Sequence, residues 1–273
     1  MLPVGEMDNA VGWPEIRELA QRAESEGLDS AWVADHFFYQ PPEGKPEGMH
    51  EAWTLLSAVA AVTERIELAP LVLCSSFRSP GLVAKMAATL DLVSGGRLIL
   101  GVGAGWHDPE YEAFGFPTDH RVGRFEEWLE IVARLLRSER VTFDGRYYQV
   151  RDAVLAPPPE RRIPILVAAK GPRMLRLTAR QADAWNTAWF GHPDDQLRER
   201  LRDLEAALAA VGRDPAELEL TVGLIVRDES VAELTELVAS YEELGFGHAI
   251  VILEPRTAGA IERLAEAVRL SRE

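Results

Sequence analysis

Short apolar runs alternate with longer segments of helical periodicity along the whole chain, and this alternation restricts the fold more than any other feature. The runs that favour strands span residues 2–4, 30–34, 66–73, 98–102, 165–168, 184–187, 218–226 and 249–253. The segments that favour helices follow them near residues 14–26, 51–63, 80–93, 121–138, 172–181, 193–211, 231–244 and 257–271. The runs are apolar almost throughout, which is typical of parallel strands covered on both faces. Eight consecutive βα units therefore predict an α/β fold, a parallel eight-stranded (β/α)8 TIM barrel, with a doubly wound open sheet as the alternative.

One segment departs from this rhythm. Two short β-like runs flank Asp144-Gly145 within residues 141–150, and Asp-Gly is a strong signal for a hairpin turn. We expect a small β-hairpin that leaves the barrel there, so that residues 1–273 still form a single domain. The loop 41–50 is rich in Pro, Gly and Glu, and it is either a lid or a passive solvated loop.

Composition and charge exclude several classes of protein. The 273 residues carry 29 Lys and Arg against 44 Asp and Glu, and the net charge of −15 disfavours nucleic acid and anionic membranes as partners. No stretch approaches the ~18 consecutive apolar residues of a membrane-spanning helix, and the first residues lack the pattern of a secretion signal. The single cysteine, Cys74, leaves no intramolecular disulfide. The six histidines show no metal-ligand spacing, so we expect a cytoplasmic protein without a metal site.

Candidate site residues follow from the predicted barrel, because barrel enzymes place their chemistry at the carboxyl ends of the strands. Asp35-His36 ends the second predicted strand, and a histidine beside a carboxylate can exchange a proton near neutral pH. The alternative is a structural histidine at a strand end. Beyond the fourth strand, Trp106, His107, Glu110 and Tyr111 could wall a ligand or protonate it. Asn186 lies at the end of the sixth strand.

Glycines mark the end of the fourth predicted strand. The segment Gly101-Val-Gly-Ala-Gly105 has the spacing G-x-G-x-G, which does not match the dinucleotide fingerprint G-x-G-x-x-G. Gly103 and Gly105 therefore indicate either backbone that lies close to a flat ligand or tight packing within the protein.

A phosphate site is predicted where the fifth strand meets the following helix. The segment reads Ala168-Ala169-Lys170-Gly171-Pro172-Arg173, so small residues precede a helix whose first N–H groups and positive dipole end can bind an anion. Lys170 and Arg173 add two positive charges there. Surface placement without any ligand is the alternative.

Several segments, in the right order along the chain, carry a resemblance to a known family. They are residues 32–36 (WVADH), 71–80 (LVLCSSFRSP), 84–91, 94–98, 100–107 (LGVGAGWH), 124–127, 171–180 and 182–186. Together they resemble the bacterial-luciferase-like superfamily of oxidoreductases, and in particular its branch that uses the deazaflavin coenzyme F-420 (F420). FMN-dependent members share much of the same pattern, and the resemblance covers nearly the whole chain.

The resemblance implies a (β/α)8 barrel that binds a flavin or deazaflavin at the carboxyl ends of the strands. It places a bulge behind the ring system at Cys74-Ser75, often with a non-prolyl cis peptide bond. The cofactor-binding residues are then Asp35, Cys74, Ser75, Ser76, Gly103, Gly105, His107, Ala169, Lys170, Gly171, Arg173 and Asn186. The acid–base candidates are His36, Glu110 and, by its position after the first strand, Glu6.

The function implied by the resemblance is hydride transfer between F420, or FMN, and a small organic substrate. The first alternative is an FMN-dependent monooxygenase that uses O2 and a flavin reductase partner. Two further alternatives from other classes are a barrel that isomerises or cleaves a sugar phosphate and a flavin-binding protein without catalytic activity. The resemblance also implies a homodimer formed through outer helices of the barrel.

Overall fold

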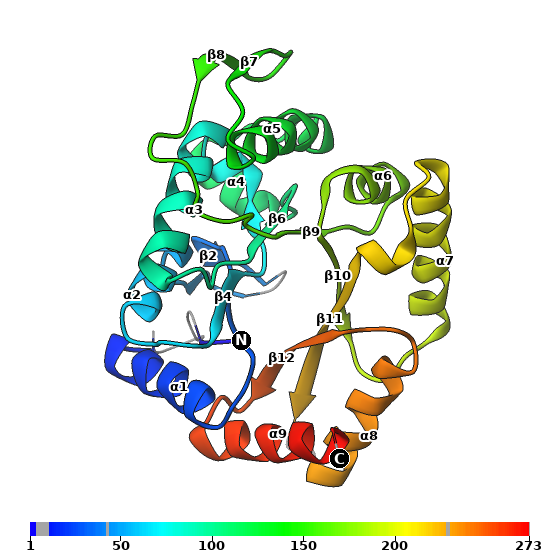
Figure 1. Ribbon diagram of the computed structural model, residues 1–273. Coiled ribbons are helices and arrows are strands. Elements are labelled where there is room, and N and C mark those ends of the chain that lie inside the picture. The colour runs from blue at the N-terminus through cyan, green and yellow to red at the C-terminus, as the bar shows by residue number, and fades with distance from the viewer. Residues whose placement is uncertain (4–10, 42–43, 228–229, 273) are drawn as a thin grey trace.

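The computed structural model describes residues 1–3, 11–41, 44–227 and 230–272. Strands lie in the middle of the molecule and helices lie around them (Figure 1). The strands are β1 (Ser30–Val33), β2 (Phe38–Tyr39), β3 (Glu47–Gly48), β4 (Glu67–Pro70), β5 (Leu73–Cys74), β6 (Leu100–Gly103), β7 (Val141–Asp144), β8 (Gln149–Ala153), β9 (Ile165–Ala168), β10 (Ala184–Phe190), β11 (Glu219–Arg227) and β12 (His248–Glu254). The helices are α1 (Trp13–Ser25), α2 (Ala52–Ala60), α3 (Pro80–Ser94), α4 (Asp108–Phe114), α5 (Arg121–Leu136), α6 (Pro172–Gln181), α7 (Asp195–Ala210), α8 (Val231–Glu242) and α9 (Ala258–Ser271), with short 3-10 turns η1 (Ser75–Phe77) and η2 (Pro215–Glu217).

The strands of the βα units pair in parallel, as the sequence predicts for an α/β fold. Six of the described strands form one sheet in the order β12-β11-β10-β9-β6-β5. Strands β1 and β4 form a separate parallel pair, and a single bridge between Leu68 and Leu98 links this pair to the segment that enters β6. The carboxyl ends of these strands therefore meet on one side of the molecule.

No ladder closes these strands into a ring within the described residues, so the closed eight-stranded barrel of the sequence analysis is not observed. Instead, the Leu2 N–H donates to the carbonyl of Trp32 in β1 over 2.8 Å, and the Met1 amino group donates to the carbonyl of Val251 in β12. Residues 1–3 thus bridge the two open edges without forming a strand. Pro3 has no N–H to extend the bridge, and Val4, the end of the predicted first strand, lies outside the described residues.

The predicted strand 66–73 is wrong as a continuous element, because it splits into β4 and β5. Strand β4 pairs with β1, whereas β5 pairs with β6. The Leu71-Val72 peptide bond between them is cis. The expected cis bond at Cys74-Ser75 is therefore also wrong, since the irregular backbone lies at the point where the chain changes its pairing partner.

Glycines of β6 make room for this irregular backbone. A Cβ on Gly101 would lie 2.1 Å from the carbonyl oxygen of Pro70, and a Cβ on Gly103 would lie 2.8 Å from a methyl group of Val72. Real side chains do not tolerate such distances, so both positions need glycine. Close packing within the protein accounts for Gly101, and Gly103 serves the same purpose beside the cavity described below.

Two antiparallel hairpins project from the parallel strands. Strands β7 and β8 pair with Asp144 opposite Gln149, which confirms the hairpin predicted near 141–150. Strands β2 and β3 pair with Phe38 opposite Gly48, so the segment that contains the loop 41–50 also has hairpin structure. Helix α4, which follows β6 directly, is not among the predicted helices because it is only seven residues long.

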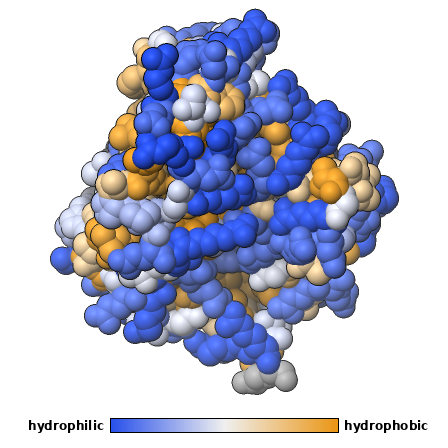
Figure 2. Space-filling view, turned by 45° about the horizontal axis from the view of Figure 1, so that its top comes forward, coloured by the Kyte–Doolittle hydropathy of each residue, from blue (hydrophilic) through white to orange (hydrophobic). Residues whose placement is uncertain are grey.

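Hydrophilic side chains cover much of the face shown in Figure 2, with apolar side chains visible between them. No helix in the described part of the chain is long and apolar enough to cross a membrane. The described residues also contain no group of three or more His, Cys, Asp or Glu side chains that could hold a metal ion.

Candidate active site

A cavity of about 580 Å³ lies at the carboxyl ends of β1, β5, β6, β9 and β10. Its size falls within the range of pockets that bind cofactors and drug-sized ligands. Its lining includes these predicted site residues: Asp35, His36, Cys74, Gly103, Gly105, His107, Glu110, Ala169, Lys170, Gly171 and Asn186. The cavity therefore lies at the edge of the sheet where the sequence analysis expects chemistry.

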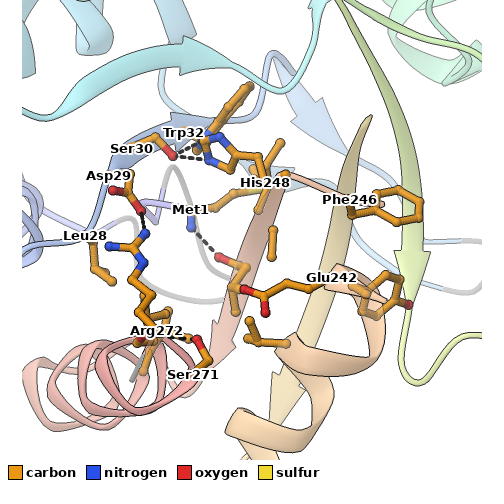
Figure 3. A pocket seen from close by; sticks show the side chains of 18 residues that line it. Met1, Leu28, Asp29, Ser30, Trp32, Glu242, Phe246, His248, Ser271 and Arg272 are labelled. Carbon is orange, nitrogen blue, oxygen red and sulfur yellow. Dashed lines mark hydrogen bonds and ion pairs between the residues drawn. The ribbon is translucent and has the colours of Figure 1, made fainter. Parts of the chain in front are cut away.

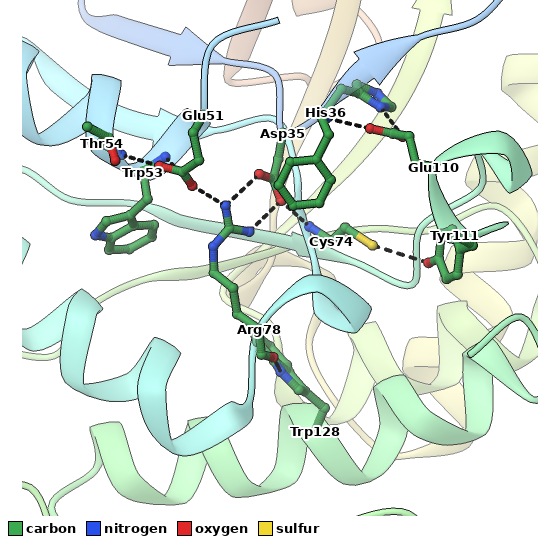
Figure 4. Close-up of polar contacts among 11 residues, drawn as sticks. Asp35, His36, Glu51, Trp53, Thr54, Cys74, Arg78, Glu110, Tyr111 and Trp128 are labelled. Atoms are coloured by element: carbon green, nitrogen blue, oxygen red, sulfur yellow. Dashed lines mark hydrogen bonds and ion pairs between the residues drawn. The ribbon is translucent and has the colours of Figure 1, made fainter. Parts of the chain in front are cut away.

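His36 and Glu110 form the centre of the site (Figure 4). The Nδ1 atom of His36 lies 2.7 Å from Oε2 of Glu110, and the backbone N–H of Phe37 donates to Oε1 of Glu110 over 2.5 Å. Glu110 is only 1% exposed, so its carboxylate depends on these donors. Because Glu110 accepts the proton on Nδ1, the Nε2 atom of His36 remains available to a ligand.

His107 has a structural role beside this pair. Its Nε2 atom accepts a hydrogen bond of 3.0 Å from the backbone N–H of Gln40, so the ring is neutral and carries its proton on Nδ1. Burial lowers its pKa, in spite of the opposing effect of the Glu110 carboxylate. His107 therefore fastens the β2–β3 hairpin to the end of β6.

The Asp35 carboxylate is engaged within the protein. It accepts a hydrogen bond of 2.8 Å from the backbone N–H of Cys74 and a bidentate pair from Arg78, at 2.8 and 2.9 Å (Figure 4). Arg78 also bonds Glu51, which caps α2. Burial opposes ionisation of Glu51, but hydrogen bonds from Thr54 and Arg78 outweigh it and lower the pKa of Glu51 to about 2. Asp35 thus holds the β5 backbone in place beside the cavity.

A buried network surrounds the thiol of Cys74. The Sγ atom lies 3.2 Å from the hydroxyl oxygen of Tyr111. That hydroxyl donates to the Ala104 carbonyl over 3.0 Å, and its oxygen lies 3.2 Å from Oγ of Ser76. Burial raises the pKa of the Cys74 thiol to about 11, so the thiol is protonated and a poor nucleophile. Ser75 is 1% exposed, and its hydroxyl oxygen has no partner among the described residues. Neither Ser75 nor Ser76 lines the cavity.

Gly105 lies two residues beyond the end of β6, beside this network. Its φ of +77° lies in the left-handed region, and a Cβ there would lie 1.9 Å from the Tyr111 hydroxyl and 2.6 Å from Cys74 Sγ. The backbone at Gly105 therefore approaches these side chains more closely than any other residue type would permit.

Lys170 and Gly171 lie where β9 meets α6, at another part of the cavity wall. Burial, together with the nearby charge of Arg200, lowers the pKa of Lys170. Arg173, in the first turn of α6, is not among the lining residues, because its exposed guanidinium pairs with Glu126 of α5 at 3.2 and 2.5 Å.

Two polar residues of β10 complete this wall. The side chain of Asn186 donates to Thr221 over 2.9 Å, and its backbone carbonyl accepts from Ala169 over 3.2 Å. Thr187, which the sequence analysis does not identify, accepts a hydrogen bond of 2.8 Å from Arg200 of α7. No local pattern marks Arg200, since it lies within a helix that is rich in charged residues.

The comparisons with known proteins establish the family. The model of the luciferase-like monooxygenases matches residues 3–233. The chain belongs to the luciferase-like monooxygenase family. The resemblance found in the sequence analysis is thereby confirmed.

Curated relatives of this family member include F420-dependent enzymes. The F420-dependent glucose-6-phosphate dehydrogenase of Amycolatopsis mediterranei is 37% identical over 68% of this chain and 57% of that protein. The corresponding enzyme of Kineococcus radiotolerans is 35% identical over 81% of this chain and 66% of that protein. The phthiodiolone/phenolphthiodiolone dimycocerosates ketoreductase of Mycobacterium tuberculosis is 34% identical over 80% of this chain and 64% of that protein. The chain thus spans less than two thirds of the length of these relatives.

Solved structures share the fold of this family member. An F420-dependent secondary alcohol dehydrogenase in complex with an F420–acetone adduct superposes with a TM-score of 0.85, at 21% identity over 95% of both chains. The F420-dependent tetrahydromethanopterin reductase of Methanopyrus kandleri has a TM-score of 0.83 at 17% identity, over 100% of this chain and 98% of that one. The monooxygenase RslO1 of Streptomyces bottropensis has a TM-score of 0.78 at 23% identity, over 96% and 97%.

A second cavity of this luciferase-like protein, of about 290 Å³, lies at the amino ends of β1 and β12 (Figure 3). The indole N–H of Trp32 donates to Ser30 Oγ, and Ser30 lies 2.6 Å from Nε2 of His248. Asp29 pairs with Arg272 at 2.7 Å. These polar groups therefore satisfy one another's hydrogen-bonding capacity. In barrel folds, residues at the amino ends of the strands contribute to stability and not to catalysis.

The predicted site and the observed lining of the larger cavity do not contain the same residues. Glu6 lies outside the described residues. Trp106 and Tyr111, expected as part of a ligand wall, and Ala168 of the predicted phosphate segment also line the cavity. The lining residues absent from the predicted set are Leu71, Val72, Phe77, Ala104, Val122, Met174, Thr187 and Ala188. Most of them are apolar, and in the sequence such residues are indistinguishable from core.

Proposed function

We propose that this chain is an oxidoreductase that binds F420 in the larger cavity and transfers a hydride between the coenzyme and a small organic substrate. The observation that carries the proposal is the His36–Glu110 pair, which lies within a cavity of cofactor size at the strand ends. The F420-dependent activities of the relatives named above support the choice of F420.

The residues of the cavity fit such a coenzyme. Leu71, Val72 and the backbone of Gly103 offer an apolar surface with little side-chain bulk, which suits a flat ring system. Lys170 and the first N–H groups of α6 behind Gly171 offer positive charge, which suits a phosphate. When bound, the deazaflavin supplies or accepts the hydride.

The protein's own contribution is to position the substrate and to move a proton. His36 donates a proton from Nε2 to the substrate oxygen when a carbonyl is reduced, and accepts it back when the alcohol is oxidised. Glu110 fixes the ring orientation, because its Oε2 atom lies 2.7 Å from Nδ1 of His36. The apolar residues around the cavity exclude water from the reacting atoms.

An FMN-dependent monooxygenase with a flavin reductase partner is the second candidate. Membership of the luciferase-like monooxygenase family and the fold shared with the monooxygenase RslO1 favour this candidate. It requires the same cavity but a different coenzyme, so cofactor affinity separates the two candidates.

We also propose that residues 1–273 form a single domain whose parallel strands close into a barrel. Met1 and Leu2 support this, because they bridge the open edges at β12 and β1. The apolar side chains exposed on α3 support a homodimer of this domain. Both proposals concern the assembly around the site and leave its chemistry unchanged.

Equilibrium titration of the purified protein with F420 and with FMN, followed by fluorescence, tests the proposed coenzyme. We expect tight binding of F420 and much weaker binding of FMN. The opposite order would move the monooxygenase to the first place. Binding of neither coenzyme would contradict both candidates.

Substitution of the proton donor tests the chemistry. We expect His36→Asn to lower the rate of F420-dependent turnover about 10²–10⁴-fold across a panel of secondary alcohols and ketones. The affinity for F420 should stay within about twofold, because asparagine keeps a polar side chain at this position and loses only the proton carrier. The exposed His120 lies outside the cavity lining, so His120→Asn is the matched control and should retain full activity. An active His36→Asn variant would rule out His36 as the acid–base group.

A further inference from the structure

Resting on the function proposed above, we propose that the substrate is an uncharged carbonyl or alcohol compound whose aromatic or alicyclic group packs on Trp106. A sugar phosphate is then not the substrate, although two of the relatives named above act on one. Two independent observations carry this inference: the aromatic wall beside His36 and the distribution of charge around the cavity.

Trp106 presents a large apolar surface to the cavity beside the proton-transfer group. It lines the cavity, and yet 62% of its surface is exposed, which is unusual for the largest apolar side chain. Its ring centroid lies 5.7 Å from that of His36, with the two planes at 80°. A ligand that reaches Nε2 of His36 therefore also reaches the indole.

The indole is held in place before any ligand arrives. The Trp106 ring lies 5.0 Å from that of His107 and 6.3 Å from that of Tyr39, and the Tyr39 and His107 rings stack at 5.4 Å. The hydrogen bond from Gln40 to His107 fastens this group to β6. A preformed aromatic surface costs little conformational entropy on binding, so it favours ring-bearing ligands.

The charge around His36 disfavours a phosphate. Glu110 places a buried carboxylate 2.7 Å from the imidazole. Two arginines of neighbouring segments pair with carboxylates of the protein: Arg78 bonds Asp35 and Glu51, and Arg121 bonds Asp108 and lies 4.2 Å above the Tyr111 ring.

Among the described lining residues, Lys170 is the one lysine or arginine, and it lies at the β9–α6 junction. That junction is where the phosphate of the coenzyme is proposed to bind. A substrate phosphate near His36 would therefore meet the Glu110 carboxylate and no lysine or arginine of the cavity lining, whereas a neutral ring compound would avoid this repulsion and pack on the indole.

The test compares three probes on the wild-type protein: acetophenone, acetone and glucose 6-phosphate. Loading with F420 is first verified by its fluorescence, and each probe is then titrated into the loaded protein by calorimetry. We expect acetophenone to bind at least about tenfold more tightly than acetone, and glucose 6-phosphate to show no binding up to about 10 mM.

Trp106→Ala tests the role of the indole. We expect it to weaken acetophenone about five- to tenfold while acetone binding and F420 affinity stay within about twofold. Phe114→Ala is the matched control, because Phe114 is a similarly exposed aromatic residue, 54% exposed, that does not line the cavity. It should leave all three probes unchanged.

Three results would overturn the inference: tighter binding of glucose 6-phosphate than of acetophenone, no acetophenone binding up to about 10 mM, or an unaffected Trp106→Ala variant. A protein that fails to load F420 contradicts the proposed function instead. The same titrations on the unloaded protein then decide the substrate class by the same criteria.

Discussion

At the scale of single residues, Gly105 shows how little space the site leaves for change. We expect Gly105→Ala to lower the free energy of unfolding by about 2–4 kcal/mol, because a Cβ would collide with Tyr111 and Cys74 at a left-handed φ. Urea denaturation monitored by circular dichroism measures the change.

Gly259→Ala is the matched control for this variant. The nearest atom to a Cβ at Gly259 is 4.0 Å away, at the end of the Arg263 side chain, and the residue lies in the first turn of α9. We expect its stability to stay the same or to rise by up to ~1 kcal/mol, since alanine is the better helix former. Equal losses in the two variants would show that the close packing around Gly105 is not decisive.

At the scale of elements, Arg78 joins segments that are far apart in the sequence. Its guanidinium connects the loop before α3 to Asp35 after β1 and to Glu51 at the start of α2, and its carbonyl accepts from the Trp128 indole of α5 (Figure 4). We expect Arg78→Met to destabilise the protein by about 3–5 kcal/mol, because the buried Asp35 carboxylate would lose its counter-ion. Thermal and urea unfolding measure this loss.

Arg173→Met provides the comparison for Arg78→Met. Arg173 also forms an ion pair, with Glu126, but its side chain is 54% exposed, whereas that of Arg78 is 9% exposed. Solvent screens the exposed pair, so this variant should lose less than about 1 kcal/mol. Similar losses of unfolding free energy in both variants would mean that burial of the Arg78–Asp35 ion pair does not increase its contribution to stability.

At the scale of the whole molecule, α3 carries apolar side chains on its outer surface. Leu82 and Val93 are 52% and 58% exposed, and eleven residues of separation place them on the same face of the helix. We expect the wild-type protein to sediment as a dimer and the double variant Leu82→Glu/Val93→Glu to sediment as a monomer, because buried carboxylates would oppose association. Analytical ultracentrifugation measures both states.

A glutamate placed on a different helix controls for the added charge. Leu270 on α9 is 47% exposed, so Leu270→Glu adds a carboxylate away from α3 and should remain dimeric. A monomeric wild-type protein, or a Leu270→Glu variant that also dissociates, would contradict a dimer through α3.

The order of the elements and the region of the site follow from the sequence. Apolar periodicity within each run is a local property, so the parallel α/β arrangement and the Asp144-Gly145 hairpin are predictable. The rule that barrel chemistry lies at strand ends then selects His36 and Glu110 as neighbours of one cavity. The break at Leu71-Val72 is not predictable in this way, because the run 66–73 is equally apolar whichever strand it pairs with.

The sequence by itself determined the α/β class, the family and the strand ends where chemistry can occur, because these depend on residues that are close along the chain. Only the tertiary structure decided that Glu110 bonds His36, which lies 74 positions earlier in the chain, and that Arg78 pairs with the Asp35 carboxylate. It also decided that Arg173 pairs with Glu126 while Lys170 lines the cavity. These contacts depend on how strands and helices pack against one another. That packing is set by the whole core, and no local pattern encodes it.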